Sequence, residues 1–446
     1  MTHAFPRNFQ TAYLKASHGK GIYIYDENGK EYIDGSSGAL VSNLGHCVPE
    51  IIAAINEQFH KLEFGHPSRW SFQIVEEAAA LVSNLAPAEL NTVWFVSGGS
   101  EAVESALKLA RQYFYDRDGV TSSKCLTIGR WNSFHGNTLG TMAVGGAMSR
   151  RRIFSPCFKE SPKIEATYCY RCPFGLKQGS CDLQCAHSLE KEIRKIGAQY
   201  VSSFIAEPIV GSTVGALVPP DEYWPIVRDI CNRYDVLLIA DEVMTGCGRT
   251  GTGFAVQHWG VTPDIIATAK GLAAGYIPTG GMIASDKIVQ TIKNKSGGFM
   301  HGHTYNSNPI AASAVVAVMK YMTEHGVIEN VASNSSYFLS GVREILKNNP
   351  IAGEVRGMGY MCGVEIVKDR ESKTPFAKET AANAIVTKEC INAGLIIYPS
   401  GGMIDGIEGD NFLLAPPLVT TRAEIDKILD RLSAGMTTAA QRLLGK

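Results

Sequence analysis

Two apolar runs in the middle of the chain each end at a charged side chain that could do chemistry. The run VLLIA ends at Asp241, and the run DIIATA ends at Lys270. Unbroken apolar runs of this kind are typical of strands buried on both faces of a parallel sheet, where chemistry collects at the carboxyl ends. Burying a lysine is costly unless its pKa falls or its amine is used covalently. Two adjacent strands could therefore aim a carboxylate and an amine into one crevice. Without further motifs, the better interpretation would be two strand ends with a solvated Asp and a solvated Lys.

A glycine-rich turn follows another apolar strand. The segment VWFV runs into Ser97-Gly98-Gly99-Ser100, and apolar residues then recur at helical spacing. Free amides at a helix N-terminus, together with glycines that allow close backbone approach, favour binding of an anion such as phosphate. A strand, a turn and a helix are a common sequence of elements, so this motif gains weight only beside the carboxylate and amine pair.

The motifs DEVMTGCGRTG (241–251) and ATAKGLAAG (267–275) resemble the class III aminotransferases, enzymes of fold type I that use pyridoxal 5'-phosphate (PLP). The resemblance extends from about residue 10 to about residue 435. It implies that Lys270 carries the cofactor as a Schiff base and that Asp241 pairs with the pyridinium nitrogen. A neutral amine condenses with an aldehyde, and a carboxylate keeps the ring protonated so that it can accept electrons. Val243, two residues further along the same strand face, would then pack against the ring.

The resemblance assigns further positions around the cofactor. Gly99 and Ser100 match the residues that hold the PLP phosphate. Phe134 matches an aromatic residue stacked on the pyridine ring, where tyrosine is usual, so the π-face is kept and a hydroxyl is lost. His135 lies beside the cofactor or is a hydrogen-bonded core histidine. Glu207 ends the apolar strand FIA, which is expected to neighbour the strand that ends at Asp241.

Two segments bear on assembly and on the substrate pocket. Thr304 matches a threonine that reaches the phosphate of the neighbouring subunit's cofactor, which implies a homodimer with shared active sites, or a tetramer. The stretch SSGALVSNLGH (36–46) either lines the substrate side of the cofactor or is a strand followed by a glycine-rich turn. Many amine-specific relatives have tryptophan where this chain has Leu40, so the pocket wall could differ.

No obvious arginine is available for a substrate carboxylate. Many class III enzymes use an arginine near the C-terminus, but the matching places hold Tyr398 and Leu413, which cannot make a bidentate contact with a carboxylate. Arg69, Arg150 and Arg249 are the remaining candidates. We expect Arg249 to stabilise its own loop instead.

Four cysteines form two close pairs, Cys169-x2-Cys172 and Cys181-x3-Cys185. This spacing is compatible with zinc. However, the gap between the pairs is short and the family needs no metal, so we favour a loop of buried or capping thiols and predict no catalytic metal. The arginines of RRRIF (150–154) are expected to be a solvated helix start.

The composition excludes several classes of partner. Lys and Arg number 42 and Asp and Glu 43, so the near-neutral balance offers no electrostatic case for nucleic acid or an anionic membrane. The N-terminus lacks the pattern of a secretory signal, and no apolar run approaches the roughly 18 residues that span a bilayer. Eleven scattered cysteines fit reduced thiols. A cytoplasmic protein is expected.

The expected fold class is α/β. The fold-type-I resemblance implies a large domain with a mostly parallel, seven-stranded type of sheet flanked by helices, and a small α+β domain made from both chain ends. We expect residues 1–55 and 325–446 to form the small domain and residues 56–324 to form the large PLP-binding domain. The Asn28-Gly29 pair predicts a hairpin in which both residues have positive φ, and Pro49 suits the first turn of a helix.

These motifs predict a PLP-dependent aminotransferase. It would move an amino group from a primary amine or ω-amino acid to a 2-oxo acid such as pyruvate, in ping-pong half reactions through a Schiff base on Lys270. A PLP-dependent racemase, mutase or lyase on the same fold remains open. From other classes, a non-catalytic scaffold and a metal-dependent regulator built on the cysteines also remain, although the combination of Lys270, Asp241 and the phosphate turn argues against a scaffold.

Overall fold

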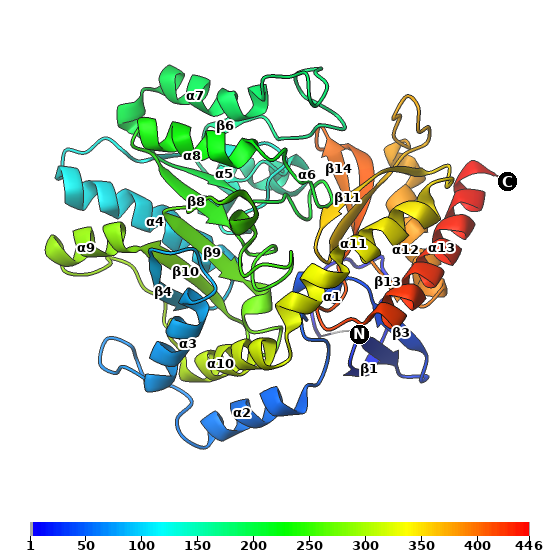
Figure 1. The fold of residues 1–446 in the computed structure, drawn as a ribbon, viewed down its shortest axis with the longest axis horizontal. Coiled ribbons are helices and arrows are strands. Elements are labelled where there is room, and N and C mark those ends of the chain that lie inside the picture. Colours follow the sequence, from blue (N-terminus) through cyan, green and yellow to red (C-terminus); the bar gives the residue numbers. More distant parts are fainter. Residues whose placement is uncertain (1–2, 446) are drawn as a thin grey trace.

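The large part of the molecule is built on a seven-stranded sheet. The computed structural model describes residues 3–445 (Figure 1). The strand order is β4-β10-β9-β8-β7-β5-β6, and β10 alone runs in the direction opposite to the other strands, so the predicted mostly parallel sheet is confirmed. The strands are β4 (Leu90–Val96), β10 (Gly280–Ser285), β9 (Ile265–Ala269), β8 (Leu237–Asp241), β7 (Val201–Ala206), β5 (Leu126–Arg130) and β6 (Lys163–Ile164).

Helices cover both faces of this sheet. One face packs against α4 (Gly99–Asp118) and α9 (Asp286–Asn294). The opposite face packs against α3 (Gln73–Ser83), α7 (Gln184–Ile196), α8 (Tyr223–Arg233) and α10 (Pro309–Glu324). Figure 1 shows α4 and α9 on one side of β8, β9 and β10, with α7 and α8 above them and α10 below.

This two-sided burial explains the unbroken apolar run before Asp241. Leu237 and Ile239 belong to the core cluster of α4, whereas Leu238 belongs to the cluster of α8. Every residue of β8 is buried. Because successive side chains of a strand point to opposite faces, a strand covered on both faces has apolar residues at every position.

The small lobe combines both ends of the chain and lies to one side of the large sheet (Figure 1). One of its sheets joins N-terminal strands to a C-terminal one: β1 (Ala16–Lys20), β2 (Tyr23–Asp26), β3 (Glu31–Asp34) and β13 (Leu395–Ile396). A second sheet contains β11 (Ala352–Met358), β12 (Met361–Ile366), β15 (Glu408–Leu414) and β14 (Tyr398–Ile404). Its helices are α11 (Val327–Leu346), α12 (Ala382–Asn392) and α13 (Arg422–Leu444).

The predicted hairpin between β2 and β3 is confirmed, with one difference in its turn. Gly29 has a φ of 80°, but Asn28 does not have a positive φ. Four residues separate β2 from β3, so the loop is longer than the two-residue turn that needs two positive φ angles. The prediction was wrong for Asn28 and correct for Gly29.

Short helices complete the chain. Pro49 occupies the first turn of α2 (Pro49–Phe59), as predicted. The others are α1 (Ser37–Leu40), α5 (Leu139–Val144), α6 (Met148–Arg151), and the 3-10 turns η1 (Arg152–Cys157), η2 (Ala198–Tyr200), η3 (Ala255–Trp259), η4 (Lys270–Leu272) and η5 (Lys378–Thr380). Within residues 3–445, no helix combines the length and the apolar character that crossing a membrane requires.

Candidate active site

The carboxyl ends of five strands meet at one edge of the large sheet. Strands β5, β7, β8 and β9 are mutually parallel. Gly280, at the start of β10, pairs with both Val96 and Ala269, so β4 also ends at this edge. The segments that leave these ends carry the chemistry-bearing motifs predicted from the sequence. The prediction that the strand ending before Glu207 neighbours the strand ending at Asp241 is confirmed.

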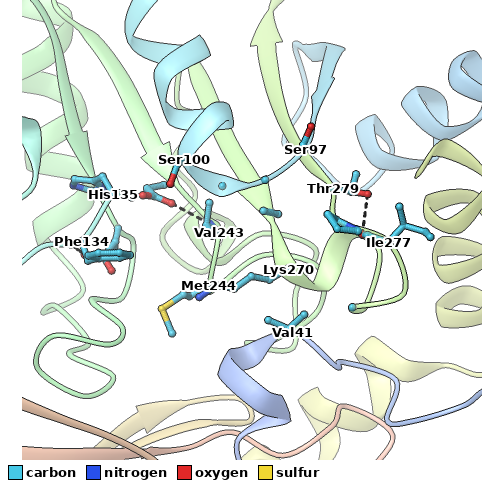
Figure 2. Close-up of a pocket in the computed structure, with 18 residues that line it drawn as sticks. Val41, Ser97, Ser100, Phe134, His135, Val243, Met244, Lys270, Ile277 and Thr279 are labelled. Atoms are coloured by element: carbon cyan, nitrogen blue, oxygen red, sulfur yellow. Dashed lines mark hydrogen bonds and ion pairs between the residues drawn. The ribbon is translucent and has the colours of Figure 1, made fainter. Parts of the chain in front are cut away.

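A cavity of about 400 Å³ opens at this edge. Figure 2 shows Lys270 extending into it near Met244 and Val41, with His135 and Phe134 on one side and Thr279 and Ile277 on the other. The lining residues are Val41, Ser97, Gly98, Gly99, Ser100, Phe134, His135, Gly136, Glu207, Asp241, Val243, Met244, Ala269, Lys270, Gly275, Ile277, Pro278 and Thr279. Eight predicted site residues are therefore brought together: Gly99, Ser100, Phe134, His135, Glu207, Asp241, Val243 and Lys270.

Asp241 is a buried carboxylate held by two partners. Its Oδ2 lies 2.7 Å from Nδ1 of His135, and its Oδ1 accepts a hydrogen bond of 3.1 Å from the backbone N–H of Val243. His135 is buried as well, and its Nε2 has no protein partner among the described residues. His135 is therefore a buried, hydrogen-bonded histidine, as one of the two interpretations predicted, and its partner is the central carboxylate.

Val243 lies beyond the strand on which it was predicted. Strand β8 ends at Asp241, and the chain turns at Val243. The prediction of a shared strand face was therefore wrong. The side chain of Val243 nevertheless lines the cavity, because its backbone N–H caps the Asp241 carboxylate and turns the chain back over the strand end.

Lys270 begins η4 with the backbone in the left-handed region, at a φ of 49°. A non-glycine residue there stores backbone strain, which persists only where surrounding structure holds it. The side chain keeps some surface open to the cavity but is enclosed by protein. Burial lowers the pKa of its amine to about 8, although the charges of Asp241 and Glu207 oppose that shift. A neutral, nucleophilic amine is therefore accessible near neutral pH.

This pKa can be measured in the cofactor-free chain. Only the neutral amine reacts with acetic anhydride, so labelling of Lys270 should rise with pH with a midpoint near 8. After unfolding in urea, the midpoint for the same lysine should move to about 10.4. Mass spectrometry of the peptide containing Lys270 measures both curves. A midpoint that is the same in the folded and the unfolded chain would contradict the effect of burial.

Glu207 is buried and contributes to the lining of the cavity. Its carboxylate accepts hydrogen bonds from the backbone N–H groups of Phe134 (3.2 Å) and Gly211 (3.1 Å). Burial raises its pKa, and the charge of Asp241 acts in the same direction. Glu207 thereby fixes the segment that carries Phe134, whose ring lines the cavity.

The turn between β4 and α4 has the features of an anion site. Gly99 and Ser100 are the first residues of α4, and in the described chain their backbone N–H groups have no protein acceptor. A side chain at Gly280 would place its Cβ 2.4 Å from the carbonyl oxygen of Gly98, so glycine is required there for β10 to lie against the turn. Thr279, which precedes Gly280, adds a hydroxyl to the cavity wall.

A protein-family model described as Aminotransferase class-III matches residues 4–436 of the chain. The chain belongs to the class III aminotransferases. It is a PLP-dependent aminotransferase of fold type I, as the sequence motifs predicted.

Relatives match this aminotransferase over almost its whole length. The uncharacterized aminotransferase YodT of Bacillus subtilis (strain 168) is 37% identical over 433 residues, which cover 97% of each chain. The putrescine–pyruvate aminotransferase of Pseudomonas aeruginosa is 33% identical over 417 residues, covering 92% of this chain and 87% of that protein. An amine transaminase from an uncultivated Pseudomonas species, solved in its PLP-bound form, has a TM-score of 0.91 and 31% identity over 98% of this chain and 99% of that one.

The cavity of this aminotransferase has charged, hydrogen-bonding and apolar groups that suit PLP. A buried carboxylate is available for a protonated ring nitrogen, and free amides at a helix N-terminus suit a phosphate. Phe134 and Val243 offer apolar surfaces for the ring, and Lys270 has no hydrogen-bond or ion-pair partner in the described chain. The residues present therefore fit the cofactor.

Several residues that line the cavity were not singled out individually from the sequence. Val41, Ser97 and Gly98 lie in the predicted 36–46 stretch and in the predicted anion-binding turn, and the others are Gly136, Met244, Ala269, Gly275, Ile277, Pro278 and Thr279. Val41 lines the cavity where Leu40, its buried neighbour, was considered. The sequence does contain a pattern that could have indicated Thr279 as a lining residue, because Thr279 directly precedes two glycines at the start of an apolar strand. No local pattern distinguishes Val41 from Leu40.

Thr304, Tyr398 and Leu413 do not line this cavity. Thr304 is exposed and lies on a separate hollow that also contains His301 and Trp70. Leu413 is buried in the small lobe, and Tyr398 is half-buried at the start of β14.

The arginines of RRRIF are not a solvated helix start, so that prediction was wrong. They span the end of α6 and the beginning of η1. Arg151 is buried and forms an ion pair with Glu160, whereas Arg152 is exposed. Arg150 is half-buried beside Phe134. The sequence pattern misled because three consecutive arginines in a tight helix point in different directions, and only one of them reaches solvent freely.

The four cysteines Cys169, Cys172, Cys181 and Cys185 line one small cavity of about 20 Å³. All four are free thiols, and burial raises the pKa of Cys169 to about 11. Across residues 3–445, no group of three or more His, Cys, Asp or Glu side chains is arranged to hold a metal ion.

Proposed function

We propose that this enzyme transfers the amino group of a primary amine or an ω-amino acid to a 2-oxo acid such as pyruvate. The observation that carries the proposal is the cavity itself, in which a lysine amine whose pKa burial lowers to about 8, a buried carboxylate and free helix amides converge beside apolar walls. Val41, Met244 and Ile277 make part of that wall apolar, which suits the hydrocarbon chain of an amine. The names of the putrescine–pyruvate aminotransferase and of the amine transaminase support the same pair of substrates.

We propose that Lys270 is the residue that bonds covalently to PLP. When bound, PLP supplies the aldehyde that takes up the amino group and the ring that accepts the electron pair of the substrate carbon. Asp241 would keep the ring nitrogen of the bound cofactor protonated, and His135 holds the Asp241 carboxylate in place. The free Lys270 amine would serve as the general base and acid that moves a proton at the substrate carbon. The two half reactions then follow a ping-pong order.

The remaining residues would orient the cofactor. The amides of Gly99 and Ser100 would hold the phosphate, while Phe134 and Val243 would pack against the ring. Glu207 would act from behind Phe134, through the hydrogen bond that fixes its backbone. Such positioning supplies several kcal/mol of catalysis in well-ordered sites (about 7–11 at the upper limit).

We further propose a cytoplasmic homodimer in which Thr304 serves the partner's active site. Its exposure, away from the cavity of its own chain, supports a role across an interface. Eleven free cysteines fit a reducing compartment. The division into residues 1–55, 56–324 and 325–446 also remains a proposal. Its first boundary falls inside α2, and its second falls at the end of α10.

A donor-by-acceptor screen with purified holoenzyme tests the reaction. Putrescine, β-alanine and 1-phenylethylamine are offered as donors, and alanine formed from pyruvate is measured. We expect alanine with at least one of these donors. A racemase, mutase or lyase would consume a donor without forming alanine, and a non-catalytic scaffold would be colourless and would fail to take up PLP. Either result would overturn the proposal.

A further inference from the structure

One arginine lies against the wall of the cavity without a charged partner. Arg150 is the third residue of α6 and is half-buried. Its guanidinium carbon is 4.8 Å from the centroid of the Phe134 ring. Phe134 lines the main cavity and also a smaller adjoining one, to which Arg150 itself contributes. A cation therefore lies directly behind a residue of the active-site wall.

The contacts of Arg150 are to neutral groups, and they leave donors free. Its Nη1 donates to Oγ of Ser212 at 2.9 Å, and its Nη2 donates to the Ser212 carbonyl at 3.2 Å and to Oγ of Ser400 at 3.4 Å. A guanidinium has five N–H groups, so two have no acceptor in the described chain. No carboxylate of residues 3–445 forms an ion pair with it. The positive charge is fixed in place but not compensated.

The charge of Arg150 reaches the reactive centre. Burial is the largest cause of the lowered pKa of Lys270, and Arg150 is one of the two cations that act in the same direction. The other is Arg249, which cannot serve a ligand. Its Nη atoms already donate to four oxygens, those of Tyr360, Pro416, Ser37 and Asn43.

Other cations near the cavity are also committed or distant. Arg151 is paired with Glu160. Arg130 is buried and donates to the carbonyl of Glu207 and to the hydroxyl of Tyr223. Arg69 is exposed and lines neither the main cavity nor the adjoining one. Among Arg69, Arg150 and Arg249, Arg150 alone lines the cavity that adjoins the main one and also has free donors and an uncompensated charge.

The contact with Ser400 ties Arg150 to the small lobe. Ser400 is in β14, two residues after Tyr398, so both side chains point to the same face of that strand. Tyr398 occupies the place that matches the carboxylate-binding arginine of many class III enzymes. Arg150 brings a guanidinium to the same face of β14 from a different part of the chain.

We propose that Arg150 recognises the acidic group of the substrate, the carboxylate of the 2-oxo acid, in place of an arginine near the C-terminus. The Nε–H and one Nη1–H of Arg150 remain free, so its positive charge can receive a carboxylate through a charge-assisted hydrogen bond, and the contact with Phe134 holds the plane of the guanidinium. This inference rests on the proposed function and names the residue that selects the amino acceptor. Donors without an acidic group would not need it.

The test separates the two half reactions in the Arg150→Gln holoenzyme. Single-turnover rates are measured with 1-phenylethylamine, which lacks an acidic group, and then with pyruvate. We expect the concentration of pyruvate that gives half-maximal rate to rise about 10- to 100-fold, the factor for losing a hydrogen bond between charged groups. The amine half reaction should change less than about threefold. Arg150→Lys keeps the charge and loses the planar guanidinium with its separate donors, so its effect should be intermediate.

Arg152→Gln is the matched control. Arg152 is two residues away and exposed, and its substitution removes the same charge, so pyruvate kinetics should stay unchanged. If Arg150→Gln slowed both half reactions equally, Arg150 would only position Phe134. If the dependence of the rate on pyruvate concentration did not change, Arg150 would not bind the carboxylate. Either result overturns the inference.

A binding measurement keeps this inference distinct from the proposed function. Propionate carries a carboxylate but cannot be transaminated, and its binding to holoenzyme can be followed by calorimetry. Binding that is lost in Arg150→Gln and kept in Arg152→Gln supports the anion site even if the screen yields no alanine. Binding that is equal in the two variants overturns the site even if transamination with pyruvate is found.

Discussion

Replacing Lys270 with alanine is expected to lower turnover by on the order of 10⁴-fold or more, because one side chain supplies both the covalent attachment and the proton transfer. The cofactor should still bind through Asp241 and the amides of Gly99 and Ser100, with lower affinity. Borohydride reduction of the wild-type holoenzyme followed by digestion should find the cofactor on the peptide that contains Lys270. In the Lys270→Ala protein no peptide should carry it.

Two comparisons make this result specific. Lys270→Arg keeps a positive charge but cannot condense with an aldehyde, so it should be as inactive as the alanine variant. Ethylamine added to the Lys270→Ala enzyme should restore part of the proton transfer, since a small free amine can occupy the space left in the cavity. Turnover within tenfold of wild type in Lys270→Ala, or a reduced cofactor found on another lysine, would remove Lys270 from the mechanism.

Asp241→Asn is expected to lower kcat/KM by on the order of 10³-fold. The substitution keeps the shape and removes the charge that holds the proton on the ring nitrogen. A carboxylate about 4 Å from a positive charge contributes about 4 kcal/mol at an effective dielectric constant of 20, which corresponds to roughly a thousandfold in rate. The asparagine also loses the charge-assisted contact that Oδ2 of Asp241 makes with Nδ1 of His135 at 2.7 Å in the wild-type chain. Steady-state kinetics and the cofactor absorbance at several pH values measure the effect.

Glu242→Gln provides the matched control for Asp241→Asn. Glu242 is the next residue, is fully buried and does not line the cavity. Its carboxylate accepts hydrogen bonds from the hydroxyl of Thr245 and the backbone N–H of Val256, and burial raises its pKa to about 7. We expect Glu242→Gln to lower thermal stability and to leave kcat/KM per holoenzyme within about tenfold. If both variants lost activity equally, the Asp241 effect would be one of folding and not of ring chemistry.

The amino-acid sequence by itself determined the elements that carry the site. The unbroken apolar run before Asp241 and the mainly apolar runs before Lys270 and Glu207 predicted buried strands, since a strand covered on both faces has few polar positions. The two glycines after VWFV specified a helix start with exposed amides. These signals are local, so residue type and spacing were sufficient.

The tertiary structure decided which loops meet at the sheet edge and which way their side chains point. His135 contacts Asp241, which lies 106 positions later in the chain, and Arg150 donates to Ser400, which lies 250 positions later. Val243 lies past the strand end, and Val41 rather than Leu40 lines the cavity. Loop conformation depends on long-range packing and on hydrogen bonds between distant segments, and spacing along the chain carries no record of those contacts.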